Sequence, residues 1–195
     1  MLGLHPSDVK ENYQEELDTI LQQFDKHTFI AIGEVGMDLY WDRTFIREQE
    51  NVLRQQIDFA LRIDLPLVIH SRKSFAEILA IFNEYSNHSL KGVFHCFSGD
   101  INQAKKVIKK GFYLGIGGTI TYKNSGIQHV VKEIPLKHLL LETDSPFLPP
   151  VPYRGKRNQS SYLSIIANHI AEIKGVTIEE VAATTTENAK LIFNI

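Results

Sequence analysis

Short apolar segments recur along the chain, and each has the length and composition of a buried β-strand. They cover residues 29–33, 65–69, 92–94, 112–116 and 139–141. Their hydrophobic residues run continuously instead of alternating with polar ones, which is typical of parallel strands that are covered on both faces. We therefore expect these segments to be the strands of a parallel β-sheet.

Segments with helical spacing of apolar residues lie between these strands. The spacing predicts helices over residues 7–24, 45–60, 75–82, 100–108, 127–134 and 162–173, with a last helical region from residue 177. Ser7 and Asp100 are suitable N-caps, Gly111 is a suitable end, and Thr177 with Glu180 has capping-box spacing. Alternating strands and helices predict an α/β fold with a parallel sheet, either open or closed into a barrel.

Composition narrows the class of protein. The 195 residues are 43% hydrophobic and 23% charged, which excludes a disordered chain and predicts a single domain over residues 1–195. No apolar run reaches the roughly 18 residues that a membrane span needs. The one cysteine, Cys96, excludes an internal disulfide, and no signal peptide is visible, so we expect a cytoplasmic protein. With a net charge of −2, binding of a polyanion would need a local site or a metal.

Residues that bind metals come at the ends of four predicted strands. Glu34, His70 and His95 directly follow three of the apolar runs, and Glu142 and Asp144 follow a fourth. Singly, such residues are usually structural histidines or helix-capping carboxylates. Because the carboxyl ends of parallel strands share one face, together they favour a divalent metal site of zinc, manganese or magnesium. Asp144 could take the proton of an attacking water.

Two further groups have chemistry suited to a nucleic acid. The basic residues Arg154, Lys156 and Arg157 follow the Asp144 loop and could hold phosphates, although a solvated loop is an equal alternative. Tyr40 and Trp41 could stack on a base, because stacking tolerates any sequence, or could pack as a lid over a barrel mouth.

Four ordered motifs carry a resemblance to a known family. They are AIGEVGMD at 31–38, PLVIHSR at 66–72, GVFHCFSG at 92–99 and LLETDSP at 140–146. In order and spacing they resemble successive motifs of the TatD-type deoxyribonucleases, and further segments, including Gly3–Pro6, extend the resemblance over essentially the whole chain.

The resemblance implies a (β/α)8 TIM-type barrel that hydrolyses DNA phosphodiester bonds with two divalent metal ions, as a 3'-5' exonuclease. It implies that Glu34 bridges both ions, that His70 and His95 bind one, and that Asp144 binds the other and activates water. Glu34 and Asp144 would thus be the catalytic residues, and Arg72 would support the site or contact phosphate. DNA would be the partner, with no membrane and no obligate protein partner.

One departure from the family pattern concerns its first strand, which carries a His-x-His that binds metal. No His-x-His occurs in this sequence. We therefore expect an incomplete barrel that lacks about the first two strands, or about 55 residues of a barrel of roughly 250. The second metal site should be weak and hydrolysis impaired. A related metal hydrolase of C–N or ester bonds and an inactive barrel remnant are the alternatives.

Overall fold

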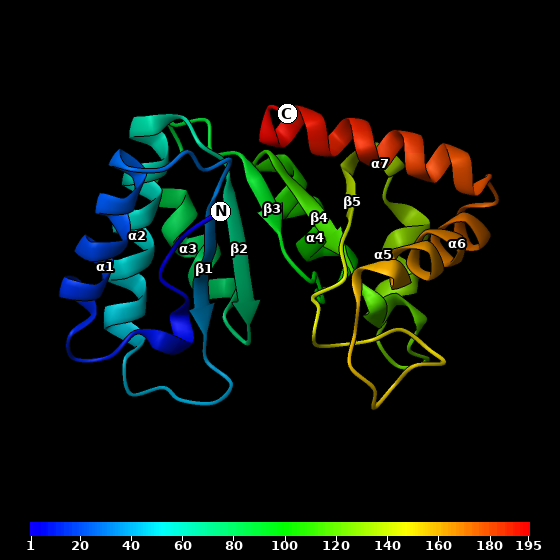
Figure 1. Ribbon diagram of the computed structural model, residues 1–195, viewed down its shortest axis with the longest axis horizontal. Coiled ribbons are helices and arrows are strands. Elements are labelled where there is room, and N and C mark those ends of the chain that lie inside the picture. The colour runs from blue at the N-terminus through cyan, green and yellow to red at the C-terminus, as the bar shows by residue number, and fades with distance from the viewer. The chain divides into compact units, whose positions relative to one another are not determined.

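The computed structural model (Figure 1) describes residues 1–195, which form two compact units. The first unit is Met1–Val93 with Phe193–Ile195, and the second is Phe94–Ile192. Both units combine parallel strands with helices, so the predicted α/β class is confirmed, whereas the single domain over residues 1–195 stays a prediction. None of the helices combines the length and the apolar character that crossing a bilayer requires.

The first unit is built on two parallel strands. Its elements are a 3-10 turn (Pro6–Asp8), α1 (Tyr13–Leu21), a second 3-10 turn (Gln22–Asp25), β1 (Ile32–Asp38), α2 (Ile46–Ile63), β2 (Leu67–Arg72) and α3 (Phe75–Glu84). β1 pairs with β2 in a register that sets Gly36 opposite His70. Leu2 forms a further parallel bridge with Ile32.

Apolar faces of the helices cover this strand pair. Val52, Leu53 and Ile57 of α2 are buried, as the helical spacing predicts, and Leu17 of α1 is fully buried. Figure 1 shows α1 beside α2, and α2 in turn contacts β1. Burial of these side chains supplies the main stabilisation of the unit.

Two glutamines break the apolar face of α2, and both bind main chain. Gln49 Oε1 accepts a hydrogen bond from Asp38 N at 2.9 Å while its Nε2 donates to Asp38 O at 3.3 Å. Gln56 does the same for Leu4, at 2.7 Å and 3.3 Å. Residues seven apart lie on one face of a helix. Helix α2 therefore forms hydrogen bonds with the main-chain N–H and C=O groups of both Leu4 and Asp38. Both residues lie close to the candidate site described below.

The second unit has its own parallel pair and helices. Its elements are α4 (Ile101–Lys109), β4 (Phe112–Ile116), a 3-10 turn (Gly118–Thr121), α5 (Ile127–Glu133), a 3-10 turn (Leu136–His138), β5 (Leu139–Leu141), a 3-10 turn (Ser160–Tyr162), α6 (Leu163–Lys174) and α7 (Ile178–Phe193). β4 pairs with β5, with Ile116 opposite Leu141. β3 (Gly92–Phe94) falls at the division between the units. Asn188 of α7 donates to the carbonyls of Leu136 and Leu139 and so fixes the start of β5.

The capping signals are partly confirmed. Asp100 caps α4 in a complete capping box with Gln103, and Thr177 Oγ1 accepts from Glu180 N at 3.1 Å. The helix expected from Ser7 is wrong, because residues 6–8 form only a 3-10 turn and α1 begins at Tyr13. The side chain of His5 accepts from Ser7 N, so this turn is capped from a residue that precedes it.

Two predicted strand ends are also wrong. β1 continues through Glu34 to Asp38, and β2 continues through His70 to Arg72. Pairing goes on because Val35 and Met37 beyond Glu34 are fully buried. The other two ends are confirmed, since β3 stops before His95 and β5 stops before Glu142.

Candidate metal centre

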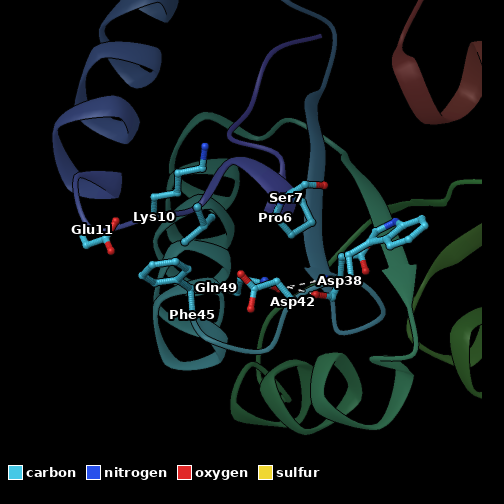
Figure 2. Close-up of a pocket in the computed structure, with 10 residues that line it drawn as sticks. Pro6, Ser7, Lys10, Glu11, Asp38, Asp42, Phe45 and Gln49 are labelled. Atoms are coloured by element: carbon cyan, nitrogen blue, oxygen red, sulfur yellow. Dashed lines mark hydrogen bonds between the residues drawn. The ribbon is translucent and has the colours of Figure 1, made fainter.

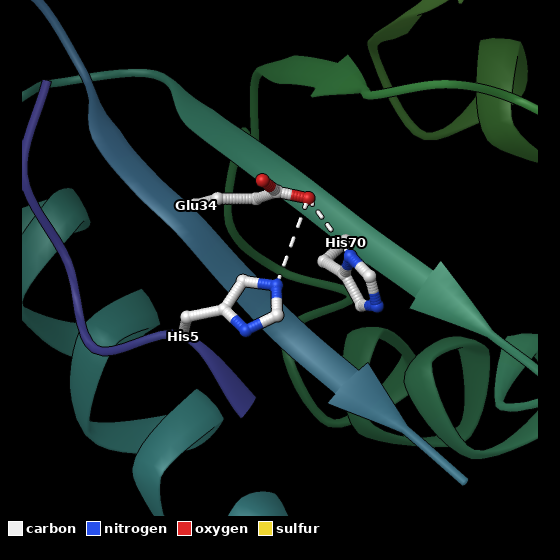
Figure 3. A group of neighbouring side chains, drawn as sticks. All are labelled: His5, Glu34 and His70. Atoms are coloured by element: carbon white, nitrogen blue, oxygen red, sulfur yellow. Dashed lines mark hydrogen bonds and ion pairs between the residues drawn. The ribbon is translucent and has the colours of Figure 1, made fainter. Parts of the chain in front are cut away.

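His5, Glu34 and His70 form a group of side chains that could hold a metal ion in the first unit (Figure 3). His70 Nδ1 lies 2.8 Å from Glu34 Oε1, and His5 Nε2 lies 3.9 Å from the same oxygen. One ligand atom from each residue lies within 4.8 Å of the others. Two imidazoles and one carboxylate suit a divalent ion such as Zn²⁺ or Mn²⁺, so the residues fit the predicted group.

Asp38 holds the second nitrogen of His70. Its Oδ2 lies 3.0 Å from His70 Nε2, and its Oδ1 accepts from Tyr40 N at 2.9 Å. Burial lowers the pKa of His70, but the hydrogen bonds and charges of Glu34 and Asp38 outweigh burial and raise that pKa above its ordinary value. Asp38 therefore orients His70, a role that the sequence did not suggest.

His5 lies against His70 and was not among the predicted site residues. The two rings meet edge to face with centroids 4.5 Å apart. His5 Nδ1 accepts from Ser7 N at 3.2 Å and lies 2.8 Å from Ser7 Oγ. Burial and the neighbouring His70 lower the pKa of His5. The segment Gly3–Pro6 was the available signal, because it belongs to the family resemblance, but no role was attached to its histidine.

A second group lies in the second unit and consists of His95, Glu142 and Asp144. His95 Nδ1 lies 2.8 Å from Glu142 Oε2, and His95 Nε2 lies 3.3 Å from Asp144 Oδ1. Cys96 N donates to the other oxygen of Glu142 at 2.7 Å. A Cβ at Gly115 would collide with the Glu142 carboxylate, so this packing needs a glycine there. Glu142 was noted at a strand end but left out of the predicted ligands.

The buried side chain of Asn158 forms hydrogen bonds with the loop that carries Asp144. Asp144 has a φ of 55°, in the left-handed region. The side chain of Asn158, which is 2% exposed, donates to the carbonyls of Thr143 and Phe147 on either side of Asp144. Asn158 thus fixes the approach of the Asp144 carboxylate to His95.

The predicted metal ligands fall into these two groups. The structure brings Glu34 and His70 together in the first unit, and His95 and Asp144 together in the second. Each predicted histidine therefore lies beside a predicted carboxylate. That all four belong to one metal centre stays a prediction.

Arg72, Tyr40 and Trp41 form an aromatic–arginine cluster in the first unit. The Arg72 guanidinium carbon lies 4.0 Å from the Tyr40 ring centroid and 5.1 Å from that of Trp41. Trp41 is 75% exposed and Tyr40 is 50% exposed. This exposure favours stacking on a ligand over the alternative of a packed lid.

The basic run also lies among aromatic rings. The Arg154 guanidinium carbon is 4.4 Å from the Tyr122 centroid, and Lys156 Nζ is 6.0 Å from that of Tyr153. Arg157 is exposed. Cations held over rings at a surface are suited to phosphates and bases.

A cavity of about 160 Å³ opens beside Asp38 (Figure 2). Its wall includes Trp41, Asp42, Phe45 and Gln49. Sites for drug-sized ligands are commonly about 300–1,000 Å³, so this cavity suits water or a very small group. Asp38 shares this cavity with the polar side chains of Asp42 and Gln49.

Comparison with known proteins places this chain in a family. The model of the family described as "TatD related DNase" matches residues 1–194. The "Uncharacterized metal-dependent hydrolase YabD" of Bacillus subtilis (strain 168) is 43% identical over 195 residues, which cover 100% of this chain and 76% of that protein. The "3'-5' ssDNA/RNA exonuclease TatD" of Citrobacter koseri is 31% identical over 199 residues, which cover 99% of this chain and 76% of that protein.

Solved structures agree with this placement. The crystal structure of YJJV, a TatD homologue from Escherichia coli K12, matches with a TM-score of 0.93 and 31% identity, over 100% of this chain and 76% of that one. The predicted family and the predicted α/β fold of the TatD barrel type are thus confirmed. The chain belongs to the TatD-related DNase family and is a metal-dependent hydrolase of that family.

Proposed function

We propose that this chain hydrolyses DNA phosphodiester bonds as a metal-dependent 3'-5' exonuclease. The observation that carries the proposal is the pair of Glu34 and His70, with Oε1 and Nδ1 2.8 Å apart, because an imidazole beside a carboxylate suits a divalent ion. The Citrobacter koseri relative is named a 3'-5' ssDNA/RNA exonuclease, which supports a nucleic-acid substrate.

Glu34 and His70 are the metal-holding residues of the first unit in this proposal, and His95 and Asp144 those of the second. A bound Mg²⁺, Mn²⁺ or Zn²⁺ would make water a better nucleophile at neutral pH and neutralise charge on the phosphoryl oxygens. Two ions are expected, and one site is expected to be weaker than the other.

Asp144 is the group that accepts the proton of the attacking water. His95 Nε2, 3.3 Å from Asp144 Oδ1, restrains that carboxylate, and Asn158 fixes its loop. Asp38 keeps His70 in one orientation through the 3.0 Å contact with its Nε2. Orientation by such neighbouring groups is a large part of what a protein contributes to hydrolysis.

Substrate contacts come from the cationic and aromatic side chains. Tyr40 and Trp41 stack on an unpaired base, and Arg72 contacts a phosphate beside them. The basic residues Arg154, Lys156 and Arg157 hold other phosphates of the substrate. The net charge of −2 leaves such local contacts as the source of affinity for DNA.

The test is hydrolysis of 3'-labelled single-stranded DNA by the purified chain with Mg²⁺, Mn²⁺ or Zn²⁺. We expect release of the label, its loss in the His70→Ala variant, and its retention in His129→Ala, whose histidine is exposed on α5. Cleavage of amides or lactones instead of DNA would move the assignment to a C–N or ester hydrolase. No bound metal at micromolar supply would support the inactive remnant.

Two narrower expectations accompany the proposal. The sequence contains no His-x-His, so we expect hydrolysis slower than that of the Citrobacter koseri relative under the same conditions. We also place the protein in the cytoplasm, because its one cysteine suits a reducing compartment. Side-by-side kinetics and cell fractionation check these points.

A further inference from the structure

The two ring nitrogens of His5 have different partners, and one partner fixes the position of the proton. Ser7 N lies 3.2 Å from His5 Nδ1, and a main-chain amide can only donate. Ser7 Oγ lies 2.8 Å from the same nitrogen and, as a hydroxyl, can also donate to it. We therefore assign the acceptor role, without a proton, to Nδ1. A neutral imidazole has one protonated nitrogen, so in His5 that nitrogen is Nε2.

Histidines that bind metals show the opposite arrangement. A ligand histidine donates the N–H of its far nitrogen to a carboxylate or carbonyl, which leaves the near nitrogen unprotonated. His70 can follow this rule when a metal binds, because Nδ1 lies 2.8 Å from Glu34 Oε1 while Asp38 Oδ2, 3.0 Å from Nε2, is placed to accept the N–H of the far nitrogen. His95 can follow it as well, because Glu142 Oε2, 2.8 Å from Nδ1, is placed to accept an N–H while Nε2 faces Asp144.

The protonated nitrogen of His5 points toward the group around Glu34 (Figure 3). The distance of 3.9 Å from Nε2 to Glu34 Oε1 is too long for a hydrogen bond. The side chain is 29% exposed, so a ligand bound beside Glu34 could reach this nitrogen. His5 thus presents a donor at the candidate metal centre.

We infer that His5 does not bind the metal and instead donates its Nε2–H to a non-bridging phosphoryl oxygen of the substrate. The inference rests on the proposed function, because the acceptor is an oxygen of the phosphodiester. The donated hydrogen bond holds the phosphoryl group and stabilises the charge on it during hydrolysis.

The segment that carries His5 is fixed before substrate arrives. Gln56 binds both main-chain groups of Leu4, and Pro6 and Ser7 begin the 3-10 turn that His5 caps. A donor held in place in this way needs no reorganisation when charge develops on its acceptor.

The first experiment determines the tautomer of His5 by 15N NMR of the imidazole nitrogens, in the full chain with and without Zn²⁺. We expect protonated Nε2 and unprotonated Nδ1 in His5 in both states, while His70 Nδ1 becomes unprotonated when Zn²⁺ binds. A protonated Nδ1 in His5, or Zn²⁺ bound at its Nε2, overturns the inference. This result does not depend on DNA cleavage, so it separates failure of the inference from failure of the proposed function.

The second experiment measures the binding of Mn²⁺ alone, and of inorganic phosphate to the Mn²⁺-loaded protein, by titration calorimetry. We expect His5→Ala to leave the Mn²⁺ affinity within about twofold and to weaken phosphate binding about 10-fold or more, the loss typical of a hydrogen bond to a charged group. His70→Ala, the matched ligand variant, should weaken Mn²⁺ binding itself.

His5→Gln provides a variant that keeps an N–H donor at about the reach of Nε2. We expect it to recover part of the phosphate affinity, and it replaces His5→Ala if the latter does not fold. A loss of Mn²⁺ affinity in His5→Ala as large as in His70→Ala overturns the inference, as does unchanged phosphate affinity in both His5 variants.

Discussion

Substitution of Asn158 tests quantitatively how the hydrogen bonds of its side chain stabilise the loop around Asp144. Its side chain is 2% exposed and donates to Thr143 O and Phe147 O, while its main-chain nitrogen donates to Pro146 O at 3.1 Å. Asn158→Ala removes the two side-chain donors and leaves the main-chain bond in place. The two carbonyl oxygens then lose their partners inside the protein.

The size of the effect follows from this count. Each hydrogen bond contributes about 0.5–1.5 kcal/mol, so the loss of two in Asn158→Ala should lower the free energy of unfolding by about 1–3 kcal/mol. Asn168→Ala is the matched control, because Asn168 is an exposed asparagine on α6 whose side chain donates only to Ser164 O, at 3.0 Å. It should change the free energy by less than about 0.5 kcal/mol.

Urea unfolding followed by circular dichroism measures both variants. Asn158→Asp adds a pH test, because an ionised carboxylate cannot donate and would face two carbonyl oxygens. Its pKa should be raised in the folded protein, so the deficit relative to the parent should shrink as the pH falls through that pKa. If Asn158→Ala loses no more stability than Asn168→Ala, the reasoning about this loop is refuted.

Three further substitutions test other contacts. Glu142→Gln replaces the carboxylate oxygen beside His95 Nδ1 with an amide group, which is a weaker acceptor or a donor. We therefore expect the Zn²⁺ affinity to fall by about 10- to 100-fold in calorimetry. Lys174→Met removes the donor to two carbonyls at the end of α5 and should cost about 1–2 kcal/mol in urea unfolding. Trp41→Ala removes an exposed ring beside Arg72 and should weaken binding of single-stranded DNA by about 1–3 kcal/mol in fluorescence anisotropy.

A contradicting outcome is defined for each substitution, with a control variant for the last two. Unchanged Zn²⁺ affinity in Glu142→Gln would show that this carboxylate does not orient His95. Lys190→Met is the control for Lys174→Met, because Lys190 is exposed and pairs only with Glu187, and equal losses would contradict the α5 contact. Trp41→Phe keeps a ring and should bind DNA more tightly than Trp41→Ala; equal binding would argue against stacking.

Much of the fold could be predicted because it depends on local pattern. Continuous apolar runs marked the strands, and the helical spacing located α2 through α6 within a few residues. The pattern failed where polar residues are buried in a strand. Glu34 interrupts the apolar run of β1, so the strand was expected to end there, although Val35 and Met37 beyond it are fully buried.

The candidate ligands could be named from the sequence, whereas the residues that orient them could not. Glu34, His70, His95 and Asp144 are candidates because of their residue types and their positions near the ends of strands. The residues that orient them are ordinary ones in sequence, because their partners lie far away along the chain: Glu142 is 47 positions from His95, and Asp38 is 32 positions from His70. Which nitrogen of each histidine faces a carboxylate depends on these distant partners and cannot be read from the sequence.

The two glutamines of α2 make that helix a mechanical link between His5 and Asp38. Gln56 forms hydrogen bonds with the main chain of Leu4, next to His5, and Gln49 does so with the main chain of Asp38. One rigid helix therefore sets the spacing between His5 and Asp38. Inserting a single residue between Gln49 and Gln56 would rotate one glutamine by roughly 100° around the helix axis relative to the other. Both sets of hydrogen bonds could then not form at once. A design that replaced both by leucine would look like an improved core, yet it would detach the donor and the orienting carboxylate from their common support.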